Sequence, residues 1–292
     1  MLEKFFKLSE NHTDAKTEIL AGITTFMTMA YILAVNSNML AEAGMDAGAV
    51  FVATALSATI SCFVMAFLSN YPIALAPGMG LNAFFAYTVV LQMGYTWQMA
   101  LLGVFIEGVL FIILTVTSLR EQIINCIPKD LKNAVTAGVG LFIASVGMTN
   151  AGIINTANGT LALSSLHDPL VVLSVVGLGI AGILVCRNVR GALLLSILLT
   201  SAIGMLTGIV TLPTKIVSLN VPSLAPTFMQ AFSVPLEKIF SLDMVIVVFT
   251  FLFMDLFDSV GFLVGVAAKG NLIDENGKIP KQAVAIMDKA GN

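Results

Sequence analysis

Repeated apolar runs, about eight in all, most constrain the fold of this chain, because a helix needs about 20 apolar residues to cross the hydrocarbon core of a bilayer. Membrane-spanning β-strands are shorter and alternate polar with apolar residues, whereas these runs do not alternate. Charged residues make up 11% of the 292 residues, against roughly 25% in an average soluble domain. The sequence therefore predicts an all-α polytopic membrane protein.

The loops between these runs indicate an orientation, since lysine and arginine gather in the cytoplasmic loops of membrane proteins. With the N-terminus in the cytoplasm, Lys215 and Lys238 are the only two of the 14 basic residues in loops assigned to the outside. Omitting one span would reverse every later loop and remove this asymmetry. We therefore expect these spans: Ile19–Val35, Val50–Leu68, Ile73–Val90, Trp97–Val116, Ala134–Thr149, Pro169–Cys186, Ala192–Val210 and Leu242–Ala268.

Several classes of function are disfavoured by what the sequence lacks. The N-terminal stretch MLEKFFKLSENHTDAKTE is not laid out as a cleaved signal, so residues 1–18 should form a cytoplasmic segment. No basic block suggests a nucleic-acid partner. Cys62, Cys126 and Cys186 show no metal-ligand spacing, so we expect no metal site and interpret the cysteines as small apolar fillers. A membrane-embedded enzyme is disfavoured because no nucleophile–base pattern or metal-ligand cluster is found.

The stretch PIALAPGMGLN, residues 72–82, interrupts the third apolar run. Pro77 cannot donate a backbone hydrogen bond, and Gly78 and Gly80 permit unusual dihedrals. We expect an extended IALA segment and a helix that restarts near Gly80 with its N–H groups facing a cavity, as in the discontinuous helices of secondary transporters. A plain proline kink with glycines for close packing is the alternative, and Asn82 by itself could simply bridge helices.

Two aspartates occupy the middle of the last apolar run, VIVVFTFLFMDLFDSVGFLVGV. Asp255 and Asp258 are three positions apart, so they share roughly one helix face. An ionised aspartate at the bilayer centre costs about 2.5–3.5 kcal/mol, and no lysine or arginine lies at matching depth. A desolvated carboxylate can bind a proton or accept hydrogen bonds from ligand N–H groups, which suits a proton-coupled carrier. Hydrogen bonds to backbone or hydroxyl groups remain the alternative.

A third acid and several aromatic residues accompany these aspartates. Glu107, in GVFIEGVLF, belongs either to a proton path or to a helix–helix hydrogen bond. Phenylalanines near both motifs could stack on a planar ligand, although such residues more often face lipid or other helices. They are Phe84, Phe85, Phe251, Phe253, Phe257 and Phe262.

Three stretches give the chain a resemblance to a known family. They are AGITTFMTMAYILAVN (21–36), APGMGLNAFFAYTVV (76–90) and FMDLFDSVGFLVG (253–265). In these the chain resembles purine permeases of the azaguanine-resistance type, within the nucleobase–cation symporter superfamily, and the match runs along all 292 residues. One departure is Ser37, where such permeases usually have proline after the asparagine.

The resemblance implies a fold of fourteen spans in two inverted seven-span repeats, with a short strand in the third and tenth spans. It implies proton-coupled import of guanine, hypoxanthine or adenine, with no cofactor besides the proton. Asp258 matches the acid that binds the nucleobase, while Gly80, Asn82 and Phe84 belong to the substrate site. Asp255 and Glu107 become candidates for proton coupling or for support of Asp258.

The same resemblance sets expectations for the organisation of the chain. Residues 19–210 would form the first repeat, 211–240 an extracellular loop with ordered turns, 241–268 the eighth span and 269–292 a truncated cytoplasmic loop. Six spans of the family fold would then be absent, so we expect an N-terminal portion that is inactive alone. The expected location is the cytoplasmic (inner) membrane, and a homodimer is compatible with the sequence.

Two alternatives remain open: a transporter of the same fold with another substrate, and a channel. A uracil, xanthine or anion carrier would use the same architecture, and the DLFDSVG form favours purines over these. A pure channel would show a continuous polar stripe, whereas the polar groups of this chain concentrate at two sites.

Overall fold

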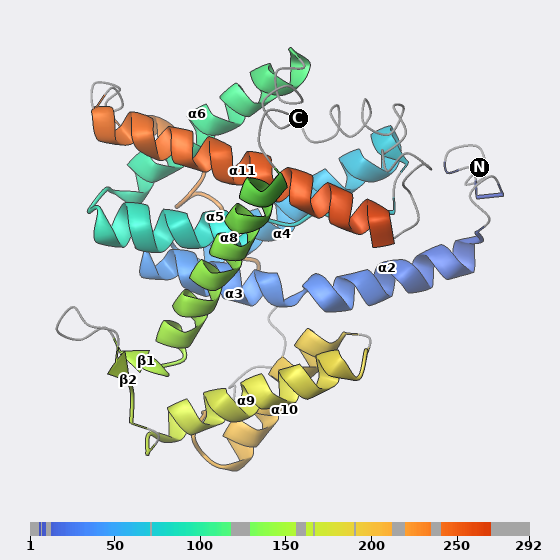
Figure 1. The fold of residues 1–292 in the computed structure, drawn as a ribbon, viewed down its shortest axis with the longest axis vertical. Helices are drawn as coiled ribbons and strands as arrows, with labels where there is room; N and C mark the ends of the chain where they lie inside the picture. Colours follow the sequence, from blue (N-terminus) through green and yellow to red (C-terminus); the bar gives the residue numbers. More distant parts are fainter. Residues whose placement is uncertain are drawn as a thin grey trace. The chain divides into compact units, whose positions relative to one another are not determined.

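The fold is almost entirely helical (Figure 1). The structure is a computed structural model that describes residue 6 and residues 8–9, 13–70, 72–117, 129–155, 162–165, 167–189, 191–211, 220–234 and 241–269. Within this part of the chain, four helices are long and apolar enough to cross a membrane: Ala15–Glu42, Ala47–Leu68, Trp97–Val116 and Pro169–Cys186. Shorter apolar helices cover Met79–Gln92, Ala137–Asn150 and Ala192–Leu206. These helices agree with the predicted polytopic membrane class.

The chain divides into two compact units, which are described separately. One unit comprises Met1–Ala34 and Leu141–Val221, and the other comprises Val35–Gly140 and Pro222–Asn292. Helix α3 (Tyr31–Glu42) and helix α8 (Lys129–Asn150) each contribute residues to both units. The predicted cytoplasmic loop 269–292 lies almost wholly outside the described residues, as does much of segment 1–18.

The first unit begins with helix α2 (Ala15–Met29), whose N-terminus is capped by Asp14. The Thr17 backbone N–H donates to Asp14 Oδ1 at 2.7 Å. This bond satisfies one of the free N–H groups at the helix start. It also holds the pKa of the Asp14 carboxyl below its ordinary value.

Helices α9 (Pro169–Cys186) and α10 (Ala192–Leu206) lie side by side in the same unit (Figure 1). Glycines allow the close approach. A Cβ added at Gly177 would lie 2.8 Å from Thr200 Cγ2, and one at Gly204 would lie 2.8 Å from Leu173 Cδ2. Strands β1 (Ile154–Asn155) and β2 (Ala162–Leu163) form a short antiparallel pair before α9, which the sequence did not predict.

The second unit contains the elements on which the candidate site is built. They are α4 (Ala47–Val64), the π-helix η1 (Met65–Ser69), α5 (Met79–Ala83), the π-helix η2 (Phe84–Gln92), α6 (Trp97–Val116), the 3-10 helix η4 (Gln230–Ser233) and α11 (Leu242–Lys269). Helix α11 packs against α6 and touches α5.

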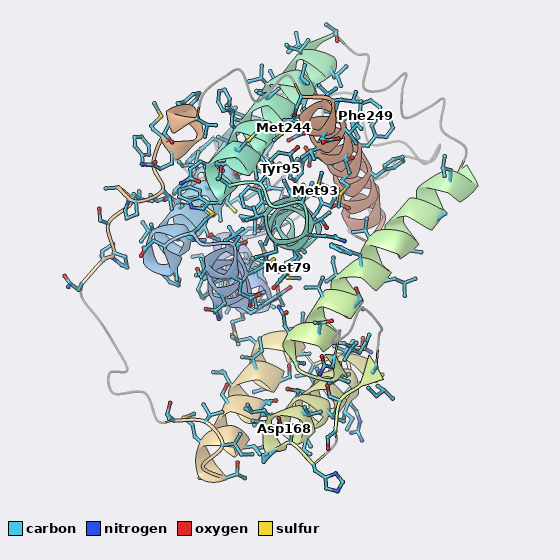
Figure 2. The ribbon with its side chains drawn as sticks, turned by 90° about the vertical axis from the view of Figure 1, so that its left-hand side faces the viewer. Met79, Met93, Tyr95, Asp168, Met244 and Phe249 are labelled. Carbon is cyan, nitrogen blue, oxygen red and sulfur yellow. The ribbon has the colours of Figure 1, made fainter. Side chains whose placement is uncertain are left out.

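The α6–α11 interface forms an apolar core in this unit. Met244 is fully buried, and a Cβ at Gly103 would lie 3.4 Å from its sulfur. Two turns further along each helix, Phe111 packs with Leu252 and Leu256. Figure 2 shows Met244 on the side of α11 that faces α6 and Phe249 on the other side. Glycine and close apolar contacts therefore fix α11 beside α6.

Several predicted spans differ from the observed helices, and the first and third are the most informative. The first was expected to end at Val35, but α3 passes through Ser37 and ends at Glu42. A proline at position 37 would remove a helical hydrogen bond, and serine leaves the helix intact. The third was placed at Ile73–Val90 with an extended IALA segment and a helix restarting near Gly80, and the helix begins at Met79. In the predicted loop 211–240, the described residues 220–234 form turns and η4, as expected.

Candidate substrate site at the broken helix

The stretch that interrupts the third apolar run is extended, as predicted. Residues 72–78 have no helical structure, and Gly78 has φ −73° and ψ 122°. The Leu75 backbone N–H donates to Cys62 Sγ at 3.2 Å, and the Cys62 thiol donates to the Leu75 carbonyl at 3.3 Å. A side chain of α4 thus satisfies both backbone groups of Leu75, as a neighbouring strand would.

This contact corrects the interpretation of Cys62 as an apolar filler. A thiol is a weak donor and a weak acceptor, and here it uses both properties on one residue. Periodicity could not reveal the contact, because it joins positions on two elements that only the fold brings together.

The helix restarts at Met79, one residue before the position expected. Gly78 is its N-cap and makes no side-chain capping bond. The first N–H groups of a helix have no partner inside the helix and carry the positive end of its dipole. Gly80 is buried in this first turn. A glycine there lets another group approach the backbone closely.

Asn82 joins three elements through a chain of side-chain hydrogen bonds. Asn82 Nδ2 donates to Asn36 Oδ1 at 2.6 Å, and Asn36 Nδ2 donates to Thr54 Oγ1 at 2.8 Å. Asn36 is 4% exposed and Thr54 3%, whereas Asn82 is half-buried. The alternative interpretation of Asn82 as a helix-bridging residue is therefore correct for one end of its amide. Among the described residues, Asn82 Oδ1 has no partner.

Sequence reasoning missed Asn36 and Thr54 as members of this group. A signal was available, because a polar side chain within an apolar span is expensive unless it is paired or functional. Asn36 lies at the end of the ILAVN stretch of the first run. Which partner it would choose depended on the packing of α3 against α4 and α5.

Phe84 connects the broken helix to α11. Its ring meets that of Phe251 edge-on, with centroids 5.2 Å apart and an interplanar angle of 82°. The predicted ligand-stacking residue thus packs against another aromatic residue, and Phe251 is buried. Phe249, Phe253 and Phe257 instead contact one another in sequence along α11 through tilted ring pairs. They lie roughly opposite Phe251 around the helix, since successive residues of a helix are rotated by about 100° about its axis.

The level of Asp258 follows from the Phe84–Phe251 contact. Figure 1 shows that α5–η2 and α11 run in opposite directions. Asp258 follows Phe251 by two turns, so it shares the same face and lies about 10 Å further along α11. Gly78 precedes Phe84 by six positions, which carries it about 9 Å in the same direction. Asp258 therefore reaches the level at which α5 begins.

Asp255 lies about 60° from Asp258 around α11, on the part of the shared face nearer α6. It follows Phe251 by four positions, which rotates it by about 40° toward the residues that contact α6. Ser259 Oγ donates to Asp255 Oδ1 at 3.5 Å. Asp258 is half-buried and makes no hydrogen bond to any described residue. The two aspartates therefore have different surroundings, one toward α5 and one toward α6.

Glu107 lies inside the α6–α11 interface. It is four positions from both Gly103 and Phe111, which contact α11, and it is only 6% exposed. Its Oε1 atom has no hydrogen-bond partner among the described residues. The negative charges of Glu107 and Asp255 act on each other. The structure thus brings these two predicted residues together, with Glu107 buried and Asp255 half-buried.

An open hollow of about 620 Å³ lies at the other end of η2. It is lined by residues that precede or begin α6 and by the segment before α11, including Tyr95, Gln98 and Ser233. Tyr95 is three positions beyond the end of η2 (Figure 2). The hollow is therefore distinct from the region of Gly78 and Asp258. Among the described residues, no cluster of His, Cys, Asp and Glu could hold a metal ion.

A polytopic helical protein with a discontinuous helix is typical of secondary transporters. The sequence profile of the family described as the Permease family matches residues 16–279. The chain belongs to this family.

Three relatives support the assignment. The guanine/hypoxanthine permease PbuG of Bacillus subtilis is 46% identical over 98% of this chain and 67% of its own length. The adenine permease AdeP of Escherichia coli is 41% identical over 98% of the chain and 63% of its own length. A putative permease of Methanocaldococcus jannaschii is 47% identical over 99% of the chain and 66% of its own length. The chain spans about two thirds of the length of these relatives. They confirm the resemblance to purine permeases. They also confirm that the family consists of transporters and not of enzymes.

Proposed function

We propose that this chain is part of a carrier that imports purine nucleobases, namely guanine, hypoxanthine or adenine, together with protons. The names of the relatives support the purine substrate. The observation that carries the proposal is the position of Asp258. Its carboxylate is unpaired among the described residues, and helical geometry puts it at the level where α5 begins, where the helix N–H groups have no intrahelical partner.

These groups suit a neutral base with both donors and acceptors on its edge. The Asp258 carboxylate accepts hydrogen bonds from ring N–H groups. The N–H groups at Met79 and Gly80 donate to ring nitrogens or to a carbonyl oxygen, and the missing side chain of Gly80 lets the base approach them. Phe84 limits the site on the side of the Phe251 contact. Pro77 and Gly78 keep the preceding backbone out of the helix.

Glu107 and Asp255 form the proton-binding part of the proposal. Two carboxylates near each other cannot both be ionised without a large cost when they are buried. Glu107 is buried with one unpaired oxygen, and the charge of Asp255 acts on it. A proton on this pair removes the repulsion. Asp255 is three positions from Asp258, so the two residues lie on the same turn of α11. A base that binds at Asp258 would therefore alter the surroundings of the proton-binding pair.

The experiment is uptake of radiolabelled hypoxanthine, guanine and adenine by cells that lack their own purine permeases. Uptake should require the chain and should fall when a protonophore removes the proton gradient. Uracil and xanthine serve as competitors, since a carrier for these bases is the second candidate. Uptake of purines that persists with the protonophore would contradict proton coupling. Competition by uracil alone would replace the purine assignment.

The membrane arrangement is part of the same proposal. We place the chain in the cytoplasmic (inner) membrane with its N-terminus inside, as the first part of a fourteen-span fold in two inverted repeats, and with a homodimer as its assembly. The distribution of lysine and arginine supports this orientation. A cysteine introduced at Val221 should react with an impermeant reagent in intact cells. Reaction near Arg187 instead would reverse the orientation.

A further inference from the structure

The hydrogen-bonded side chains of Thr54, Asn36 and Asn82, named here the amide relay, have a property that the proposed function does not use. The relay links α4, α3 and the first turn after the break through contacts of 2.8 Å and 2.6 Å. Asn36 and Thr54 are buried, so neither exchanges its partner with water. Only Asn82 is half-buried, and only its free end is available to a ligand.

The relay can carry its hydrogen bonds in either direction. In one direction Asn82 Nδ2 donates to Asn36, which donates to Thr54 and leaves Asn82 Oδ1 free. In the other direction the Thr54 hydroxyl donates to Asn36, which donates to Asn82 and leaves Asn82 Nδ2 free. An amide has both a donor and an acceptor side, and a hydroxyl can act as either. Both directions therefore satisfy every link, with the two amide groups turned over and the helices unmoved.

We propose that the amide relay determines which group of Asn82 faces the substrate, and that its reversal lets one site bind both 6-oxo and 6-amino purines. This inference rests on the proposed function. A 6-oxo purine such as hypoxanthine presents an acceptor at position 6, whereas adenine presents a donor there. Asn82 meets the first with its Nδ2 group and the second with its Oδ1 atom.

Asp258 cannot supply this discrimination. A carboxylate only accepts hydrogen bonds, so it suits the imidazole N–H that hypoxanthine and adenine share. Helix N–H groups only donate. Of the groups at this level, the Asn82 amide can offer a donor or an acceptor. A site that binds a hydrogen-bonding group usually rejects an analogue that leaves a polar group unpaired. Reversal of the relay removes that penalty.

The test fixes the direction of the relay and measures the ratio of affinities for the two bases. Asn36→Asp places an acceptor at both links, so Asn82 must donate to position 36 and present Oδ1 to the substrate. We expect the ratio of hypoxanthine Ki to adenine Ki, from competition uptake by the full chain, to rise about tenfold in favour of adenine. The corresponding loss of one hydrogen bond is worth about that factor.

Matched variants separate this role from a structural one. Thr54→Val keeps the shape and removes the end of the relay without imposing a direction, so both affinities should fall by the same factor. If Asn36→Asp does not reach the membrane, Asn82→Asp tests the same point, because its carboxylate also presents only an acceptor. An unchanged ratio in a membrane-inserted acidic variant would overturn the inference. Absence of purine uptake by the complete, unmodified carrier would instead contradict the proposed function.

Discussion

Two helix pairs in different units, α9–α10 and α5–α11, pack through different kinds of side chain. The first pair relies on glycines that meet Thr200, Leu173 and Val210 at short distance. The second pair meets through the Phe84–Phe251 contact, with a break before α5 and Asp258 two turns beyond the contact. Close packing of small residues stabilises helices in a bilayer, whereas unpaired polar groups at membrane depth are expensive. The comparison separates a region built for packing from the one proposed to bind the substrate.

The largest expected effect concerns Asp258 and tests the binding half of this comparison. Asp258→Asn keeps the shape but removes the carboxylate, so purine affinity should fall by about 1.5–3 kcal/mol, or roughly 10–150-fold. Competition uptake measures the affinity, and thermal unfolding in detergent should change little. Asp255→Asn is the control and should be milder, because Asp255 lies toward α6. Normal affinity in Asp258→Asn with loss in Asp255→Asn would exchange their roles.

A smaller effect, on stability alone, is expected in the α9–α10 pair. Gly204→Ala would place a methyl group 2.8 Å from both Leu173 Cδ2 and Val210 Cγ2, and relief of such overpacking costs about 1–3 kcal/mol. Thermal unfolding should shift down while the Ki for purines stays the same. Gly182→Ala on α9 is the matched control, since nothing lies within 4 Å of its added Cβ. Equal losses in both variants would contradict the role of close packing.

The smallest effect concerns the thiol that holds the extended segment beside α4. Cys62→Ala removes both bonds to Leu75 and should cost about 1 kcal/mol of stability. Cys62→Ser retains a donor and an acceptor and should recover most of this loss. Thermal unfolding with uptake in parallel distinguishes the two variants. If Cys62→Ser and Cys62→Ala lose the same stability, the thiol contributes only its volume. The contact would then depend on packing, as the α9–α10 pair does.

Parts of the fold follow from local chemistry and could be predicted. Long apolar runs predicted the membrane class because helix length and bilayer thickness are fixed quantities. The extended segment at 72–78 followed from Pro77 and Gly78, whose backbone limits are properties of single residues. The start of α5 differed by one residue because the N-cap falls on Gly78. The β1–β2 pair was missed because two-residue strands leave no periodic signal.

The sequence by itself determined that the chain is a helical membrane protein, that its third span is broken, and that Asp258, Asp255 and Glu107 are exceptional residues for such an environment. Only the tertiary structure decided their neighbours. It set Phe84 against Phe251 and gave Asn82 and Leu75 their partners in Asn36 and Cys62. The physical reason is that backbone breaks and desolvation costs belong to individual residues. Partner choice instead depends on how helices distant in sequence pack, and no local pattern encodes that.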